Sequence, residues 1–289
     1  MFFSIRSKVR SEVRFLSIAA SLAASAAALN SQSVLAQPVT STMTTGSANT
    51  SGGTDTWQFS AGMGVMSRAK YPGSSETKTT ALPLFSANYG RFFIGGVPNA
   101  GVPLGAGVNL LQSGPWRAGV AVGFNPGKAR RESDAARLKG MGDIDGTVMG
   151  SVFGSYDDKY FAVKSSLVTD VGGKNQGTRF SMDLEGKYAV SDRLMFSAGP
   201  GFTWADSKYT QTYFGVTAAQ SASSGLAAYS ASSGLNNVRF SLGANYKLTP
   251  QWGLMTRITT ESLRGDAVKS PLTEKKSQNS LGVFANYRF

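Results

Sequence analysis

The sequence predicts an all-β protein, namely a transmembrane, antiparallel up-and-down β-barrel of about twelve strands and of the outer-membrane type. Three observations predict this fold. The chain begins with a secretory signal, its later segments alternate between apolar and polar residues, and its connections alternate between short and long. The 289 residues are enough for one such domain.

Residues 1–36 have the order of a secretory signal peptide. Residues 1–14 carry four basic side chains against one acidic side chain, and residues 15–29 are apolar but short for a membrane span. Val34-Leu35-Ala36 places compact residues before a cleavage site, so we expect cleavage after Ala36. A retained membrane anchor is the alternative, but the flanks and the length favour removal.

The mature chain is expected to begin with a flexible periplasmic tail, because residues 37–56 are rich in Ser, Thr and Gly and could not form a core. The barrel is then expected over residues 57–289. The formal net charge is +12 for the whole chain and +9 once the signal peptide is removed. Export makes nucleic acid an implausible partner, whereas membrane lipid, lipopolysaccharide phosphates, anionic solutes and peptidoglycan are plausible.

The sequence has no cysteine and no histidine. Disulfides, thiolate chemistry, a Ser-His-Asp triad and a His-ligated zinc site are therefore excluded. No other catalytic constellation stands out, so we expect no enzyme activity, no cofactor and no metal.

The strands are predicted from a period of two. In residues 179–190, apolar side chains such as Met182 and Leu184 alternate with polar ones such as Asp183 and Glu185. The same alternation over many segments predicts twelve strands, near residues 57–66, 80–89, 91–97, 104–111, 116–124, 145–156, 159–170, 178–190, 194–206, 235–248, 252–263 and 278–289. A soluble sandwich would show similar single strands.

The connections separate the barrel from the sandwich. Tight turns are predicted at residues 113–115, 157–158, 191–193 and 249–251. Longer loops are predicted between them, at residues 67–79, 125–144, 207–234 and 264–277. Outer-membrane barrels place short turns toward the periplasm and long loops outside.

The last predicted strand ends in Tyr287-Arg288-Phe289. A final amphipathic strand that ends in an aromatic residue resembles the recognition signal for the barrel-insertion machinery. Tyr287 and Phe289 are therefore our candidate assembly signal, and an ordinary edge strand that happens to end in Phe is the alternative.

If the apolar face of each strand meets lipid, the polar face lines the lumen. Eight basic and three acidic residues are predicted there: Arg117, Lys164, Arg179, Lys187, Arg239, Lys247, Arg257 and Arg288, with Asp183, Glu185 and Glu261. One interpretation is a narrow pore that prefers anions. The interpretation that we favour is that these charges pair and pack a small lumen. Arg179 and Lys187 flank Asp183 and Glu185 along one strand face, so paired charges explain these carboxylates more simply than acid-base chemistry.

Two of the predicted loops are candidates for recognition. The loop at residues 125–144 mixes basic and acidic residues, so it either binds lipopolysaccharide phosphates or forms an internally paired surface loop. The loop at residues 207–234 is long for a structureless connection and contains Tyr209, Tyr213, Phe214 and Tyr229. Aromatic residues at that density prefer burial, so we expect this loop to fold over or into the barrel mouth, as a recognition site or as a plug.

Several blocks of sequence resemble the MipA/OmpV family, named after MltA-interacting protein. They are Tyr71-Pro72-Gly73-Ser74, Leu138-Lys139-Gly140-Met141-Gly142 with Asp143, Tyr213-Phe214-Gly215-Val216-Thr217 with Gln220 to Tyr229, Arg264 to Ala267 with Ser270-Pro271-Leu272, and Tyr287-x-Phe289. The blocks occur in family order between about residues 57 and 289. The tail at residues 37–56 has no counterpart that we can match to the family.

The resemblance implies an outer-membrane barrel without catalytic residues. In the best-described member it implies a scaffold that bridges a lytic transglycosylase and a bifunctional penicillin-binding protein, and other members are linked to adhesion or small-solute passage. Three functions therefore stay open: a scaffold between the outer membrane and peptidoglycan enzymes, a narrow anion-preferring pore, and an adhesin that acts through residues 125–144 and 207–234.

Overall fold

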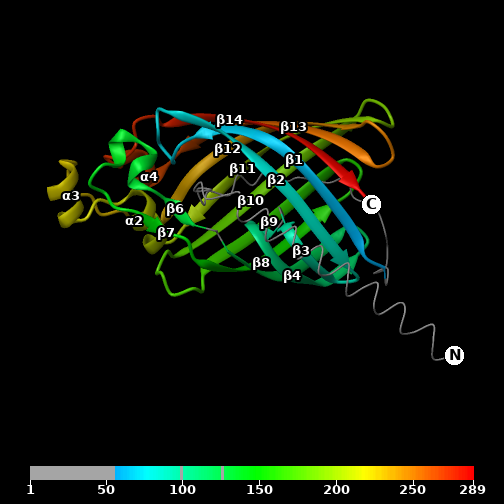
Figure 1. Cartoon of the computed structure of the whole chain (residues 1–289), viewed down its shortest axis with the longest axis horizontal. Helices are drawn as coiled ribbons and strands as arrows, with labels where there is room; N and C mark the ends of the chain where they lie inside the picture. The colour runs from blue at the N-terminus through cyan, green and yellow to red at the C-terminus, as the bar shows by residue number, and fades with distance from the viewer. Residues whose placement is uncertain (1–55, 98–99, 125–126) are drawn as a thin grey trace.

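The fold is a closed barrel of antiparallel strands (Figure 1). The computed structural model describes residues 56–97, 100–124 and 127–289, so the predicted signal peptide and nearly all of the predicted tail lie outside the described residues. Within the described residues, twelve strands form the barrel: β1 (Gln58–Ala69), β2 (Thr77–Tyr89), β3 (Phe92–Val97), β4 (Val102–Ser113), β5 (Trp116–Phe124), β8 (Val148–Asp157), β9 (Phe161–Asp170), β10 (Thr178–Ala189), β11 (Leu194–Ala205), β12 (Gly234–Lys247), β13 (Trp252–Leu263) and β14 (Ser277–Arg288). All twelve predicted strands are confirmed, with ends that differ by a few residues.

The barrel closes by pairing its last strand with its first. β14 and β1 are antiparallel, from Ser60 opposite Arg288 to Ser67 opposite Leu281. Every other neighbour in the barrel is the next barrel strand along the chain, which is the up-and-down order. Closure removes the exposed edges that an open sheet would present.

The two faces of the barrel follow the period of two. On β10, Met182 and Leu184 are exposed by 37 % and 46 % on the outer face, whereas Arg179 and Glu185 on the inner face are exposed by 5 % and 7 %. The outer face therefore suits lipid, and the polar face lines the lumen as predicted.

Aromatic side chains gather on the strand ends next to the short turns. Trp116 stacks edge-on against Tyr156 with ring centroids 4.8 Å apart, and Trp252 packs against Tyr287 at 5.2 Å. Such a girdle is typical of a membrane interface, because the rings have both apolar and polar parts. We call this end of the barrel the turn end and the opposite end the loop end.

The four predicted tight turns are confirmed, and the long connections meet at the loop end. Those connections carry structure of their own: a small sheet of β6 (Lys128–Arg130) and β7 (Ile144–Asp145), two 3-10 turns, η2 (Glu132–Asp134) and η3 (Ala136–Leu138), and helices α2 (Ser207–Phe214), α3 (Ala218–Ser224) and α4 (Gly265–Lys269). Figure 1 shows them together beyond the left end of the barrel. We call this assembly of residues 70–76, 127–147, 206–233 and 264–276 the cap.

Local sequence explains the helices of the cap. Asp206 caps α2 by accepting a hydrogen bond from the Tyr209 backbone N–H at 2.8 Å. Thr217 and Gln220 form a reciprocal capping box at the start of α3, and Gly225 ends that helix in the left-handed conformation at φ 73°. No helix in the described part of the chain is long and apolar enough to span a membrane.

Candidate functional site: the lumen and the cap

Charged side chains from three strands meet in the lumen around Glu185. Lys164 on β9 approaches Glu185 Oε2 at 3.0 Å, and Arg257 on β13 approaches Glu185 Oε1 at 2.8 Å. All three side chains are at least nine-tenths buried. One carboxylate therefore holds two cations from opposite directions and ties β9 to β13 across the lumen.

A second group forms around Asp183. Arg239 on β12 donates to both carboxylate oxygens, from Nε at 2.8 Å and from Nη2 at 2.7 Å, and also donates from Nη1 to Thr203 Oγ1 at 2.9 Å. Lys187 pairs at 2.6 Å with Asp157, a lumen acid that the sequence analysis did not include. The lumen charges pair at these positions, as expected. The partners of Asp183 and Glu185 lie on other strands, however, and are not Arg179 and Lys187, which flank them on β10.

The remaining predicted lumen charges are not in ion pairs within the described residues. Arg179 is buried, donates from Nη2 to the Gly101 carbonyl at 3.0 Å and lies over the ring of Tyr209 at 5.8 Å. Arg117, Glu261 and Arg288 are half-buried, with Glu261 opposite Arg239 in the strand register, and Lys247 is exposed near the turn end.

Residues 100–102, which lead into β4, lie against the lumen, a feature that the local sequence did not predict. Ala100 is fully buried, its carbonyl accepts a hydrogen bond from Ser151 on β8, and the next carbonyl, that of Gly101, reaches Arg179 on β10. We call residues 100–102 the lumen tip. Pro103 and the Gly95-Gly96 pair beside it interrupt the strand alternation, which is the signal that could have indicated an irregular hairpin.

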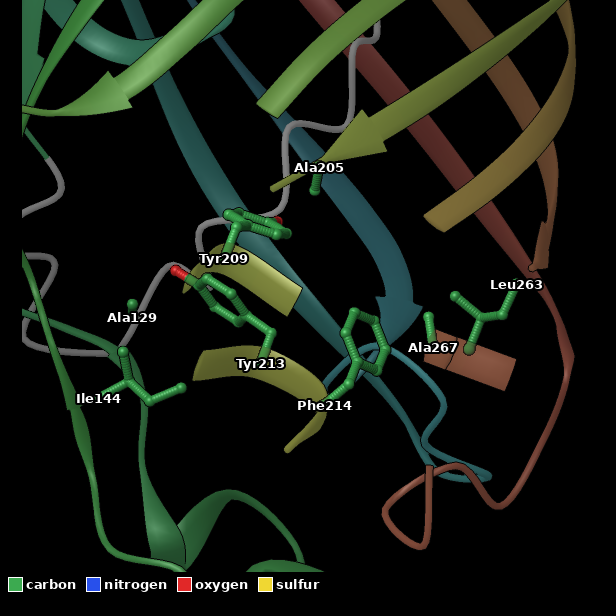
Figure 2. Close-up of a cluster of buried hydrophobic side chains, with 8 residues drawn as sticks. All are labelled: Ala129, Ile144, Ala205, Tyr209, Tyr213, Phe214, Leu263 and Ala267. Atoms are coloured by element: carbon green, nitrogen blue, oxygen red, sulfur yellow. The ribbon is translucent and has the colours of Figure 1, made fainter. Parts of the chain in front are cut away.

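The cap has an apolar core that is built on the aromatic residues of α2. Tyr209, Tyr213 and Phe214 are all buried and pack with Ala129, Ile144, Ala205, Leu263 and Ala267 (Figure 2). In Figure 2 the Phe214 ring points toward Ala267, whereas the Tyr213 ring points toward Ile144 and Ala129. Three of the four predicted recognition aromatics are thus buried at the mouth of the barrel, because Ala205 and Leu263 end strands of the barrel itself.

Polar contacts to backbone carbonyls fasten α2 to its neighbours. Arg130 donates from Nη1 to the Tyr213 carbonyl at 3.1 Å, and Ser270 donates to the Phe214 carbonyl at 2.5 Å. Burial lowers the pKa of Arg130 to about 10, so its guanidinium stays charged at neutral pH. Tyr229 is half-buried, and its hydroxyl donates to the Asp266 carbonyl at 3.0 Å. This hydrogen bond joins the segment that follows α3 to α4.

A second apolar cluster joins the first and last loops of the cap. Tyr71, Leu138, Met141, Val216 and Leu272 are buried together. The Tyr71 hydroxyl lies 3.1 Å from both the Leu272 carbonyl and Glu274 Oε2, so it can donate to either acceptor. Burial, followed by the nearby Glu274 carboxylate, raises the pKa of the Tyr71 hydroxyl.

Glu274 also binds the first loop of the cap, residues 70–76, through hydrogen bonds. Its Oε2 accepts hydrogen bonds from the backbone N–H and the hydroxyl of Ser75, both at 3.1 Å. Burial alone would raise the pKa of Glu274, but the hydrogen bonds from Ser75 and Tyr71 outweigh burial and leave that pKa below its usual value.

Several charged side chains of the loop at residues 125–144 form ion pairs or hydrogen bonds with other groups of the cap. Lys128 pairs with Asp143, Glu132 accepts from the Gly140 and Gly142 backbone N–H groups at 2.6 Å and 3.1 Å, and Arg137 donates to the Pro271 carbonyl. These contacts fit the interpretation of an internally paired loop. Lys139 remains exposed on it.

The loop blocks that carry the family resemblance meet in the cap, although they are up to about 200 residues apart in the chain. Tyr71 contacts Leu272 and Glu274, and Gln220 donates to the Met141 carbonyl at 2.8 Å. The blocks are therefore contact sites between loops, and their spacing in the sequence follows from the strands that separate them.

Comparison with known proteins finds a matching family model and distant relatives. The family model described as MltA-interacting protein MipA matches residues 61–289. MltA-interacting protein of Escherichia coli is 21 % identical over 64 % of this chain and 75 % of its own length, and the putative outer membrane protein YiaT of Escherichia coli is 23 % identical over 80 % and 91 %. A NanC porin structure covers 78 % of this chain and 100 % of its own, with 10 % identity and a TM-score of 0.43.

The family match spans most of the chain, and the matched segment includes all five blocks and nearly the whole barrel. The apolar outer face, the aromatic girdle and the relatives agree on location. This chain is therefore an outer-membrane β-barrel protein that belongs to the MltA-interacting protein MipA family.

Proposed function

We propose that this protein is a non-catalytic scaffold that links the outer membrane to peptidoglycan-remodelling enzymes. One observation carries the proposal: the cap packs a buried aromatic core over the mouth, and the lumen below it is crossed by ion pairs. A lumen that is crossed by ion pairs and covered by a packed cap suits an anchor better than a pore. The name of the Escherichia coli relative, MltA-interacting protein, supports a lytic transglycosylase as one partner, and we propose a penicillin-binding protein as the other.

The partner surface would be the turn end, because short turns face the periplasm in this topology. Its exposed basic residues include Lys159 between β8 and β9 and Arg193 between β10 and β11. The predicted periplasmic tail at residues 37–56 would add to this surface.

Affinity purification from detergent-solubilised membranes tests the scaffold. The wild-type barrel should recover a murein hydrolase or synthase. A variant with Lys159→Glu and Arg193→Glu should recover at least fivefold less, whereas Lys139→Glu at the cap should not change the yield. Recovery of neither enzyme class by a barrel that shows heat-modifiable migration on gels would refute the scaffold.

The anion-preferring pore is the second candidate, because the predicted lumen residues include more bases than acids. Planar-bilayer recording separates the two functions. The plugged scaffold should show no ohmic conductance, whereas a steady anion-selective conductance of the wild type would establish the pore. An adhesin remains the third candidate through α3, which projects farthest from the barrel (Figure 1). Loss of surface binding on deletion of Ala218–Ser224 would support it.

A further inference from the structure

The outer face of the β13–β14 pair changes from apolar to polar toward the loop end. Figure 1 shows the two strands side by side along the upper side of the barrel. The register pairs on this face run, from the turn end, Trp252–Tyr287, Leu254–Ala285, Thr256–Val283, Ile258–Leu281, Thr260–Asn279 and Ser262–Ser277. Ile258 and Leu281 are exposed by 48 % and 45 %, as residues that face lipid should be. We call the last two pairs the polar rungs.

The polar rungs are particular to this part of the wall. On β11 and β12 the outer face stays apolar to the loop end, where Trp204 pairs with Leu235 and both are exposed, by 41 % and 38 %. On β5 and β8 the last pair is Phe124 with Val148, again apolar and exposed. The apolar surface therefore ends earlier along the strands of β13 and β14 than along these other strands.

The height of the polar rungs matches the border of the outer leaflet. Ser262 is ten residues from Trp252, which is roughly 34 Å along a strand and roughly 26 Å in height at a tilt of about 40°. The apolar band of such barrels is about 25 Å tall. The next outward residue, Arg264, lies roughly 5 Å higher, at the level of lipid phosphates.

Three cations lie directly above the polar rungs. Arg264 donates from Nη1 to Ser262 Oγ at 2.7 Å, so its guanidinium lies against the upper rung. The Leu263 N–H donates to the Lys276 carbonyl at 2.9 Å, which places Lys275 opposite Arg264 at the end of the strand pair. Arg264, Lys275 and Lys276 are all exposed, and none of them forms an ion pair with a described residue.

The acidic residues of the same loop are bound elsewhere. Asp266 accepts a hydrogen bond from the Ser232 backbone N–H at 2.8 Å and lies 3.7 Å from Lys269. Glu274 Oε2 accepts from Ser75, as described above. Like charges opposite each other on paired strands destabilise the pair, so an anion bound between Arg264 and Lys275 would stabilise this end of β13 and β14.

We propose that the outer face of β13 and β14 binds one lipopolysaccharide molecule. A lipid A phosphate lies on Arg264, Lys275 and Lys276, the glucosamine hydroxyl and amide groups bond to the polar rungs, and the acyl chains cover the apolar pairs below. The vertical order of cations, hydroxyl and amide groups, and apolar side chains matches the order of phosphate, sugar and acyl chain in lipid A.

Lipopolysaccharide fits this face better than a phospholipid does. The phosphate of a phospholipid is joined to its chains through glycerol, so a phospholipid has no sugar for Thr260, Asn279 and Ser277. The loop at residues 125–144 is not needed for the binding, because several of its charges are paired within the cap. The site does not depend on the proposed scaffold function.

Native mass spectrometry of the full barrel with hexa-acylated lipid A tests the cations. The wild type should retain one lipid A, and the variant Arg264→Gln, Lys275→Gln and Lys276→Gln should retain it about tenfold more weakly or less, because charge-assisted contacts are lost. The matched control removes three exposed lysines elsewhere, by Lys139→Gln, Lys159→Gln and Lys174→Gln, and should leave retention unchanged. No retention by the wild type, or equal retention by the two variants, would overturn the proposal.

The choice of ligand is tested with the same measurement. Lipid A without its phosphates should be retained at least tenfold less, and phosphatidylglycerol at equal concentration should not displace intact lipid A. Thr260→Val with Asn279→Leu should reduce retention of lipid A at least threefold, whereas Thr256→Val, on the same face but below the rungs, should not. Heat-modifiable migration on gels confirms that each variant is folded. Equal competition by phosphatidylglycerol, or a dimer through β13 and β14 that excludes lipid A, would overturn the proposal.

Discussion

Replacement of Glu185 by glutamine tests whether the ion pairs stabilise the barrel. The amide keeps the shape of the side chain but removes the negative charge that holds Lys164 at 3.0 Å and Arg257 at 2.8 Å. Two buried cations are then left without their carboxylate. Removal of one partner of a buried ion pair costs about 3–5 kcal/mol, so Glu185→Gln should lower the free energy of unfolding by that amount.

Urea unfolding of the barrel in lipid vesicles, followed by tryptophan fluorescence and by heat-modifiable migration on gels, measures this change. Glu76→Gln is the matched control, because the Lys70–Glu76 pair is exposed by 28 % and 47 % and should contribute less than about 1 kcal/mol. The triple variant Lys164→Met, Glu185→Leu and Arg257→Met should lie within roughly 2 kcal/mol of the wild type, because it removes all three charges together. If Glu185→Gln costs no more than Glu76→Gln, or if the triple variant is as unstable as the single one, the reasoning is wrong.

Three further predictions concern the cap and the last strand. Phe214→Ala should remove about 3–5 kcal/mol of packing from the cap and increase proteolysis of residues 207–234 at least a hundredfold, whereas Phe240→Ala on the lipid face should leave that rate unchanged. The lowered pKa of Glu274 means that its contribution to cap stability is present above the unfolded pKa of about 4.3 and is lost as the pH falls through the folded pKa. Hydrogen-exchange protection factors of the 70–76 loop should therefore fall on acidification below about pH 4, and a Glu274→Gln variant in which they still fall equally would contradict this. Replacement of both Tyr287 and Phe289 by alanine should reduce the yield of folded barrel in membranes severalfold, whereas the barrel that does assemble should lose only the packing of Tyr287 on Trp252, about 1 kcal/mol. An unchanged yield would remove these residues as the assembly signal.

Much of the cap was not predictable from local sequence. The capping box of Thr217 and Gln220 with Gly225 is a local signal that indicates α3 in advance. By contrast, the contact of Tyr71 with Leu272 and Glu274 joins residues about 200 positions apart, and nothing near Tyr71 in the chain indicates it. The burial of Tyr213 and Phe214 was expected from their apolar surface, but the groups that bury them come from two other loops and from the ends of β11 and β13.

The sequence by itself determined the strands, their number and the face on which each side chain lies, because the period of two is a local property of an extended backbone. It thus placed Asp183 and Glu185 in the lumen. It did not determine which cations hold them, because alternation specifies a face and not a height or a partner strand across the barrel. Only the tertiary structure decided that Arg239, Lys164 and Arg257 pair with these carboxylates, and that the Gly101 carbonyl reaches Arg179. These features depend on the stagger of strands that are far apart in the chain, and that stagger is set by closure of the whole barrel.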